Sequence, residues 1–279
     1  MIALGLIVAT LPPAAWPWPH DSASTPLLER VPPPEGAERL LVEPGSFGAW
    51  LRQLPVLPGT PPVLLFDGRP KRNQTAQAYV LDLDVGKKDL QQCADAVMRL
   101  YAEYLVATGA SAKLSFHLTS GAPMPFQPWI EGDRPVVLPS GQVRWAKGAA
   151  ASGSGRAVFG AYLELVFTYA GSASLAQDLR PPTGPIEPGD VVIHGGHPGH
   201  AVIVLDVAIR GEQRFALLAQ SYMPAQQIHV LRSLSGPDPT WVPVSKEGVL
   251  TTPEWTFDWS ERRRFGCTKA CNEAPDRQR

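Results

Sequence analysis

The sequence predicts a single α+β domain in which helices pack on an antiparallel sheet. In the first half of the chain, apolar residues recur mainly at helical spacing. From Asp190 onward, short apolar runs are separated by turns that contain Gly or Pro, which is typical of an antiparallel meander. The 279 residues, 44% of them hydrophobic, suffice for one large core once the Pro-rich N-terminal segment is set aside.

Capping residues and apolar spacing place the elements in order. Ser46 is expected to cap the first helix, and Asp89, with Gln92 three residues later, to cap the long helix that carries Cys93. Apolar and polar residues alternate in Gln77–Val85, as in a half-buried strand. The predicted order is a helix after Ser46, strands Val63–Phe66 and Gln77–Val85, a helix from Asp89 to Gly109, a strand Lys113–Leu118, a helix between Ser154 and Gly171, and strands Asp190–His194, His200–Val207, Phe215–Tyr222 and Gln227–Leu231.

Three segments are predicted along the chain. Residues 1–38 are expected to be a signal peptide and a Pro-rich linker, because the apolar run Met1–Leu11 gives way to Pro, Trp and small residues. Residues 39–266 form the predicted domain, and residues 267–279 a polar C-terminal tail. The alternative explanation of the first residues is a misassigned start codon or a disordered tail. Export to the periplasm or beyond is the expectation, and no segment of the mature chain reaches the roughly 20 apolar residues of a membrane-spanning helix.

Charge argues against one class of partner. The chain holds 25 Lys and Arg against 26 Asp and Glu, a formal net charge of -1, so no strong field attracts a polyanion. We therefore expect no nucleic acid partner. The basic run Arg262–Arg264 is short and fits a solvated surface.

The three cysteines divide into a pair and a single thiol. Cys267 and Cys271 lie close together in the polar tail, and we expect them to form a disulfide in an oxidising compartment. Cys93 then remains unpaired. Such a thiol is either buried and inert or reactive.

The densest polar group lies between two predicted strands. His200 begins the second strand after a Gly/Pro turn, where rigid backbone can hold a general base within reach of solvent. A histidine bonded to a carbonyl of the turn fits the same pattern. Three-residue spacing of His194, His197 and His200, with Asp190, also suits zinc. We expect no metal, because strand geometry need not bring His194 and His200 together.

Four strings closely resemble the bacterial family named Domain of Unknown Function 4846. They are Asp89–Val97, Pro198–Val204, Leu218–Gln226 and Pro253–Phe257. The resemblance runs from about Trp50 to Phe265 and takes in Trp129, Gly132 and Arg134. It implies membership of a bacterial, often exported family and brings no activity with it.

The order of Cys93, His200 and Gln220 is similar to that in papain-like amidases and peptidases of the NlpC and CHAP type. The resemblance implies a papain-like layout with Cys93 as nucleophile, His200 as base and Gln220 as the group that orients the imidazole. A helix N-terminus and an imidazolium would then hold the thiol pKa well below its free value of about 8.5. The neighbours Gln92 and Ala94 depart from the usual surroundings of such a nucleophile.

The sequence thus predicts an exported thiol-dependent hydrolase or amidase that acts without a cofactor on peptide or amide bonds of the cell envelope, with a peptide or peptidoglycan-like substrate. The alternative is a non-catalytic envelope protein that binds a peptide or glycan in the same cleft. Trp129, Arg134 and Tyr222 are the predicted substrate-binding residues, because aromatic rings stack on sugars and peptides and Arg suits a carboxylate. The alternatives are that the Trp side chain only packs in the core and that the Arg side chain is bound to a local acid.

Overall fold

Helices and antiparallel strands are both present, as the α+β prediction requires. The computed structural model describes residues 16–148, 150, 152–153, 155–236 and 238–266. In these residues the helices are α1 (Leu27–Arg30), α2 (Phe47–Leu51), α3 (Cys93–Ala107), α4 (Phe126–Ile130), α5 (Arg156–Tyr169) and α6 (Ser172–Asp178), with short 3₁₀ turns at Ser111–Lys113 and Trp259–Glu261. The strands are β1 (Thr25–Pro26), β2 (Glu38–Arg39), β3 (Pro55–Val56), β4 (Gln77–Val80), β5 (Ser115–His117), β6 (Pro123–Pro125), β7 (Arg134–Val137), β8 (Val143–Ala146), β9 (Val191–His194), β10 (His200–Arg210), β11 (Gln213–Gln220), β12 (His229–Leu231), β13 (Trp241–Pro243), β14 (Val249–Thr251), β15 (Thr256–Asp258) and β16 (Arg262–Arg263). The domain is therefore rich in strands.

Eight strands of the described chain form one antiparallel sheet. Its order is β16-β9-β10-β11-β12-β4, and β13 also pairs with β11 and β2 with β10. Side chains alternate along β10, so that Ala201 and Ile203 join one apolar cluster while Val202 and Val204 join another. Because both faces of the sheet are buried, β10 is an almost continuous apolar run in the sequence.

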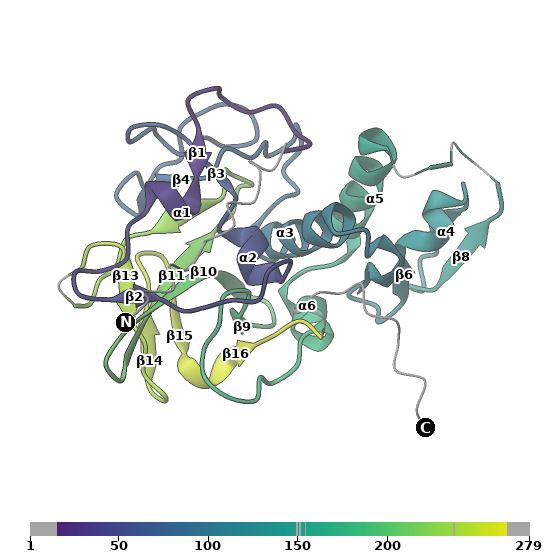
Figure 1. Ribbon diagram of the computed structural model, residues 1–279. Coiled ribbons are helices and arrows are strands. Elements are labelled where there is room, and N and C mark those ends of the chain that lie inside the picture. The colour runs from purple at the N-terminus through teal and green to yellow at the C-terminus, as the bar shows by residue number, and fades with distance from the viewer. Residues whose placement is uncertain (1–15, 149, 151, 154, 237, 267–279) are drawn as a thin grey trace, which may run out of the picture.

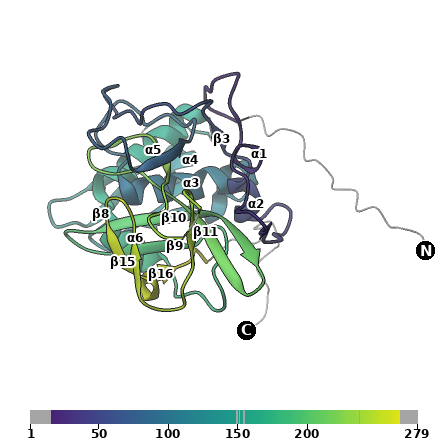
Figure 2. The ribbon, with the colours of Figure 1, turned by 90° about the vertical axis from the view of Figure 1, so that its left-hand side faces the viewer.

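A helix covers one face of the sheet and a hairpin the other. Helix α3 packs against β10 and β11, and the hairpin β14–β15 adds Leu250 and Phe257 to the cluster on the opposite face. Figure 1 shows α3 running from the sheet toward a lobe that contains α4, α5 and β8. Figure 2, which looks at the molecule from its sheet side, shows α3 beyond β10 and β11. The N-terminus of α3 is thereby brought to the sheet.

Two predicted strands of the first half are shorter than expected. Ser46 caps α2 as predicted, since its hydroxyl accepts the Ala49 backbone N–H at 3.2 Å. Val63–Phe66, however, forms only isolated bridges, because no neighbouring strand runs alongside it for more than a residue. Of Gln77–Val85, only β4 is strand, because β12 pairs with no residue beyond Val80.

Residues 16–38 belong to the domain, which corrects the prediction of a linker up to residue 38. Trp18, Leu27 and Val31 are buried in the main apolar cluster. Strand β2 pairs with β10, and the Arg39 guanidinium binds the buried Asp206 carboxylate of that strand. Pro residues break up the segment, so its packing leaves no periodic pattern to read.

Two further predictions concern parts of the chain outside the described residues. The apolar run of the predicted signal peptide lies in residues 1–15, and the predicted Cys267–Cys271 disulfide lies in residues 267–279. Within the described chain, no single helix has both the length and the apolarity to cross a membrane. Helices α5 and α6 pass that test only as a pair, across a bend of 109°.

Candidate functional site

Cys93 is the first residue of helix α3, although the sequence predicts a helix that begins at Asp89. Gln92 has extended backbone angles and caps the helix, and its backbone N–H donates to the Asp95 carboxylate at 3.0 Å. Asp89 does not cap the helix as predicted, because its carboxylate accepts the Ala225 backbone N–H at 2.6 Å. The thiol therefore lies at the end of α3, where the partial positive charge of a helix is greatest.

His200 and Gln220 meet at the ends of neighbouring strands. His200 opens β10, Gln220 closes β11, and Nε2 of the imidazole lies 2.7 Å from Oε1 of the amide. An amide oxygen only accepts, so the imidazole donates its Nε2–H. The His200 residue is 1% exposed, and its ring lies 4.8, 5.3 and 5.7 Å from the rings of Tyr222, Trp255 and Phe257. The ring is thus held on several sides.

Ala201 and Tyr222 connect Cys93 to this pair. A backbone hydrogen bond links the Cys93 thiol to Ala201, the residue that follows His200. Tyr222 contacts the imidazole edge-on, and burial, followed by the charges of Glu254 and Cys93, raises the pKa of its hydroxyl. No hydrogen bond within the described residues joins Cys93 directly to His200. Tyr222 thus lies near both Cys93 and His200.

Burial keeps both the thiol and the imidazole uncharged. Cys93 is 8% exposed, and burial raises its pKa to about 11, against an opposing backbone hydrogen bond with Ala201 and with a further increase from the Asp95 charge. Burial lowers the pKa of His200 to about 4, although the bond to Gln220 raises it. The predicted thiolate with a lowered pKa is therefore wrong for the resting site, because loss of water outweighs the helix N-terminus.

A cleft of about 260 Å³ opens beside Cys93. Its walls come from the residues before and at the start of α3, from the junction of α5 with α6, and from the turn between β9 and β10. Asp95 lines the cleft, and among the described residues its Oδ1 atom is buried without a hydrogen-bond partner. Burial raises the pKa of this carboxyl to about 8. A buried carboxyl oxygen without a hydrogen-bond partner among the described residues thus belongs to a residue of the cleft wall.

The turn that precedes β10 packs tightly on α6. A Cβ atom on Gly199 would lie 2.2 Å from Ser172 Oγ, and Gly196 has a φ of +148°. Only glycine fits both positions without displacing the turn. This packing explains the Gly/Pro-rich sequence before His200 and fixes the point at which β10 begins.

The structure does not bring Trp129 and Arg134 to the cleft. Trp129 is 4% exposed, packs edge-on against Tyr162, and donates its indole N–H to the Val158 carbonyl at 3.0 Å. The Arg134 guanidinium lies 4.2 Å from the Trp129 ring centre and donates to the Trp129 carbonyl at 2.9 Å. These contacts hold the segment between α4 and β7 together. Of the three predicted substrate-binding residues, only Tyr222 lies near Cys93.

His194 and Asp190 of the predicted zinc alternative have other partners. His194 pairs with His200 in the strand register, but its Nδ1 lies 2.6 Å from Glu261 Oε1, and the Trp255 ring contacts both imidazoles. Asp190 is buried and bound to two arginine side chains. The described residues contain no group of three His, Cys, Asp or Glu side chains arranged to hold a metal ion.

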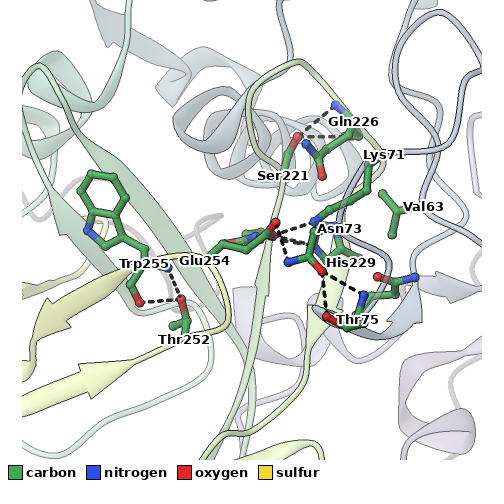
Figure 3. A network of polar contacts seen from close by, with 12 residues as sticks. Val63, Lys71, Asn73, Thr75, Ser221, Gln226, His229, Thr252, Glu254 and Trp255 are labelled. Carbon is green, nitrogen blue, oxygen red and sulfur yellow. Dashed lines mark hydrogen bonds and ion pairs between the residues drawn. The ribbon is translucent and has the colours of Figure 1, made fainter.

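Three residues that the sequence reasoning missed lie behind Gln220. Glu254 Oε2 accepts from Gln220 Nε2 at 2.7 Å and from Lys71 Nζ at 2.6 Å, and Lys71 Nζ lies 3.4 Å from His229 Nε2. Figure 3 shows Lys71 directed at the Glu254 carboxylate, with His229 beside it. Glu254 lies within the string Pro253–Phe257, which is part of the family resemblance and is the sequence feature that points to this residue. Lys71 and His229 belong to no recognisable motif.

Comparison with known proteins identifies a family but no characterised relative. The family model described as a domain of unknown function (4846) matches residues 27–264. No curated protein and no solved structure matches the chain.

Proposed function

The chain belongs to the Domain of Unknown Function 4846 family, and we propose that it is an exported thiol-dependent hydrolase or amidase of papain-like layout. Its substrates are peptide or amide bonds of the cell envelope. The observation that carries this proposal is the meeting of Cys93, at the N-terminus of α3, with the start of β10, where His200 is bonded to Gln220. A nucleophile, a base and a group that orients the base are the parts that such chemistry needs.

Hydrogen-bond polarity supports His200 as the base. Since Gln220 Oε1 accepts Nε2–H, the neutral imidazole has no proton on Nδ1. Nδ1 is then the basic nitrogen that takes up the thiol proton. A pKa of about 4 leaves it free to do so at neutral pH.

The reaction begins with a substrate carbonyl in the cleft at the start of α3. Cys93 Sγ attacks the carbonyl carbon while His200 Nδ1 takes the thiol proton, and backbone N–H groups of the first helical turn stabilise the oxyanion. The amine leaves with the proton from His200, and a thioester remains. Water then attacks the thioester, and His200 passes the proton of that water to the departing thiolate. The acid is released, and the thiol is restored.

Proton transfer accompanies the attack, because both partners are uncharged at rest. With the thiol pKa at about 11 and the imidazole pKa at about 4, an ion pair forms only as the carbon–sulfur bond forms. The Tyr222 hydroxyl, whose pKa is raised, stays protonated beside the imidazole. It is therefore a donor for the substrate carbonyl or the leaving group.

The burial of Cys93 favours a second candidate, a non-catalytic envelope protein that binds a peptide or glycan in the same cleft. A buried thiol with a raised pKa is what a structural cysteine has. The two candidates differ in whether His200 changes the reactivity of Cys93.

Alkylation by iodoacetamide separates the two candidates. The protein carries Cys267→Ser and Cys271→Ser, so that the label reports Cys93 alone. We expect a rate that is nearly flat between about pH 5 and pH 8, because His200 is already a base over this range. In His200→Ala, the rate should instead rise about tenfold per pH unit toward the thiol pKa.

His194→Ala is the matched control, since His194 faces His200 in the register and bonds to Glu261. Its profile should follow that of the unsubstituted protein. Equal profiles for the unsubstituted protein and His200→Ala would contradict the hydrolase and leave the binding protein. As a direct test, isolated peptidoglycan is incubated with the protein, and mass spectrometry looks for hydrolysed fragments that Cys93→Ala does not produce.

A further inference from the structure

A buried ion pair lies behind Gln220, and the reaction proposed above makes no use of it. Lys71 and Glu254 approach to 2.6 Å with side chains only 4% and 12% exposed. Asn73 donates to the second carboxylate oxygen at 3.2 Å. Such a pair adds little net stability compared with apolar residues of similar volume. Its contact with Gln220 therefore points to a role in the site.

Two acceptors face the amide NH₂ group of Gln220. Glu254 Oε2 lies 2.7 Å and His229 Nε2 lies 3.5 Å from Gln220 Nε2. His229 Nδ1 lies 2.9 Å from the Gln227 carbonyl, so Nδ1 carries the proton and Nε2 is the acceptor. An amide oxygen turned toward these two acceptors would have no donor from either. The network therefore permits one amide orientation, with Oε1 toward His200.

Lys71 fixes the state of both acceptors. Its ammonium group has donors only, and it contacts Glu254 Oε2 at 2.6 Å and His229 Nε2 at 3.4 Å. Burial, and then the Lys71 charge, lowers the pKa of His229 to about 3, which keeps Nε2 unprotonated. The direction of every hydrogen bond from Lys71 to His200 is thereby determined.

We propose that Glu254 and Lys71 are positioning residues that act through Gln220 to hold His200 in its Nε2–H tautomer. This inference rests on the proposed function, in which His200 Nδ1 receives the thiol proton. The opposite tautomer would place a proton on Nδ1 and leave Cys93 without a base. The group that orients the imidazole is thus itself oriented by a charge pair that comes from two distant loops.

The tautomer can be measured by ¹⁵N NMR of protein labelled at its six histidines. The His200 signals are those missing from His200→Asn. We expect His200 of the unsubstituted protein to be the Nε2–H tautomer. In Lys71→Met/Glu254→Leu, which leaves no lone buried charge, both tautomers should be visible, and Cys93 alkylation at neutral pH should slow by about tenfold or more.

A conservative variant tests rescue. Lys71→Met/Glu254→Gln keeps an acceptor for Gln220, while the half-buried Asn73 can bond to water instead. We expect the Nε2–H tautomer and an alkylation rate within about twofold of the unsubstituted protein, since an amide oxygen still accepts. Glu261→Gln, which weakens the contact to His194, is the matched control and should move only the His194 signals.

Two results would overturn the inference. One is an Nδ1–H tautomer of His200 in the unsubstituted protein, which needs no variant to fold. The other is an unchanged Nε2–H tautomer in Lys71→Met/Glu254→Leu. Both are read from nitrogen shifts and not from reactivity. The first would also remove the base of the proposed hydrolase. The second leaves the hydrolase intact, since failure of the hydrolase is reported by the His200→Ala alkylation profile.

Discussion

The surroundings of Asp95 oppose its ordinary ionisation. Its Oδ2 accepts the Gln92 backbone N–H, and it lies in the first turn of α3, where a negative charge is favoured. Burial nevertheless raises its pKa to about 8, and Oδ1 has no partner in the described chain. At neutral pH, the folded protein therefore holds a proton here that the unfolded chain releases.

We expect Asp95→Asn to change how stability depends on pH. The folded pKa of about 8 lies above 3.8, the ordinary pKa of an Asp side chain in an unfolded chain. The contribution of Asp95 to the free energy of unfolding is therefore complete below about pH 4 and is lost as the pH rises toward 8. The loss is about 1.4 kcal/mol per pH unit. The amide keeps the oxygen that accepts from Gln92, and it cannot ionise. Urea unfolding of both proteins should show a difference that grows from pH 5 to pH 8, whereas parallel curves would contradict it.

The sequence neighbours of Cys93 predict its position at a helix start but not its burial. Its position near a helix start is predictable from the capping residues around it. Its burial is not, because residues such as Ala201 and Tyr222, more than a hundred positions away, surround it. The pKa of a thiol depends on that enclosure, so the sequence alone left open whether Cys93 is buried and inert or reactive.

Elements were predictable where apolar runs end at Gly or Pro. Strands β9, β10 and β11 begin within two residues of their predicted starts for this reason. The start of α3 was misplaced, because Asp89 and Gln92 fit a capping box and only the tertiary structure reveals the competing Ala225 backbone. Strands of two residues, such as β2, have no pattern of their own and depend on their partner strand.

Some residues of the candidate site were likewise predictable from the sequence, and others were not. The sequence itself displays the order of Cys93, His200 and Gln220. Each of them is the first or the last residue of a helix or strand. Lys71 and Glu254 lie outside strands and helices, and either alone is an ordinary surface residue type. Only the folded chain brings them together.

Helix α1 offers a test of whether residues 16–38 stabilise the domain. Leu27 is fully buried, and its neighbour Leu28 is 40% exposed. We expect Leu27→Ala to lower the free energy of unfolding by about 2–5 kcal/mol, and Leu28→Ala by less than about 0.5 kcal/mol. Urea denaturation measures both. Equal small losses would mean that the segment is a dispensable linker after all.

At the scale of the whole molecule, buried carboxylates tie distant segments to the central strands. Asp206 in β10 binds Arg39 and Arg52, which lie far before it in the chain. Asp190, next to β9, binds Arg264 from the last described segment. Removing one partner of such a pair typically costs about 3–5 kcal/mol. The sheet is thus anchored from both directions along the sequence.

Two buried imidazoles should make the whole fold sensitive to acid. The folded pKa values of His200 and His229, about 4 and about 3, lie below the usual 6.5. Their contribution to stability is therefore complete above about pH 6.5 and is lost as the pH falls toward these values. Each contributes a slope of about 1.4 kcal/mol per pH unit. Between pH 6 and pH 5, His229→Gln should reduce the slope of unfolding free energy by that amount, and an unchanged slope would contradict this.

The pairing order of the sheet also bears on how the protein is made. On the ribosome, Cys93 emerges long before His200, Gln220 and Glu254, and strand β16, which closes the sheet edge beside β9, comes later still. A nascent chain therefore carries the thiol without its imidazole, its amide or the carboxylate behind them. Domains generally fold as units once their sequence is available. Whatever chemistry the site performs begins only after the segment that carries Glu254 has left the ribosome.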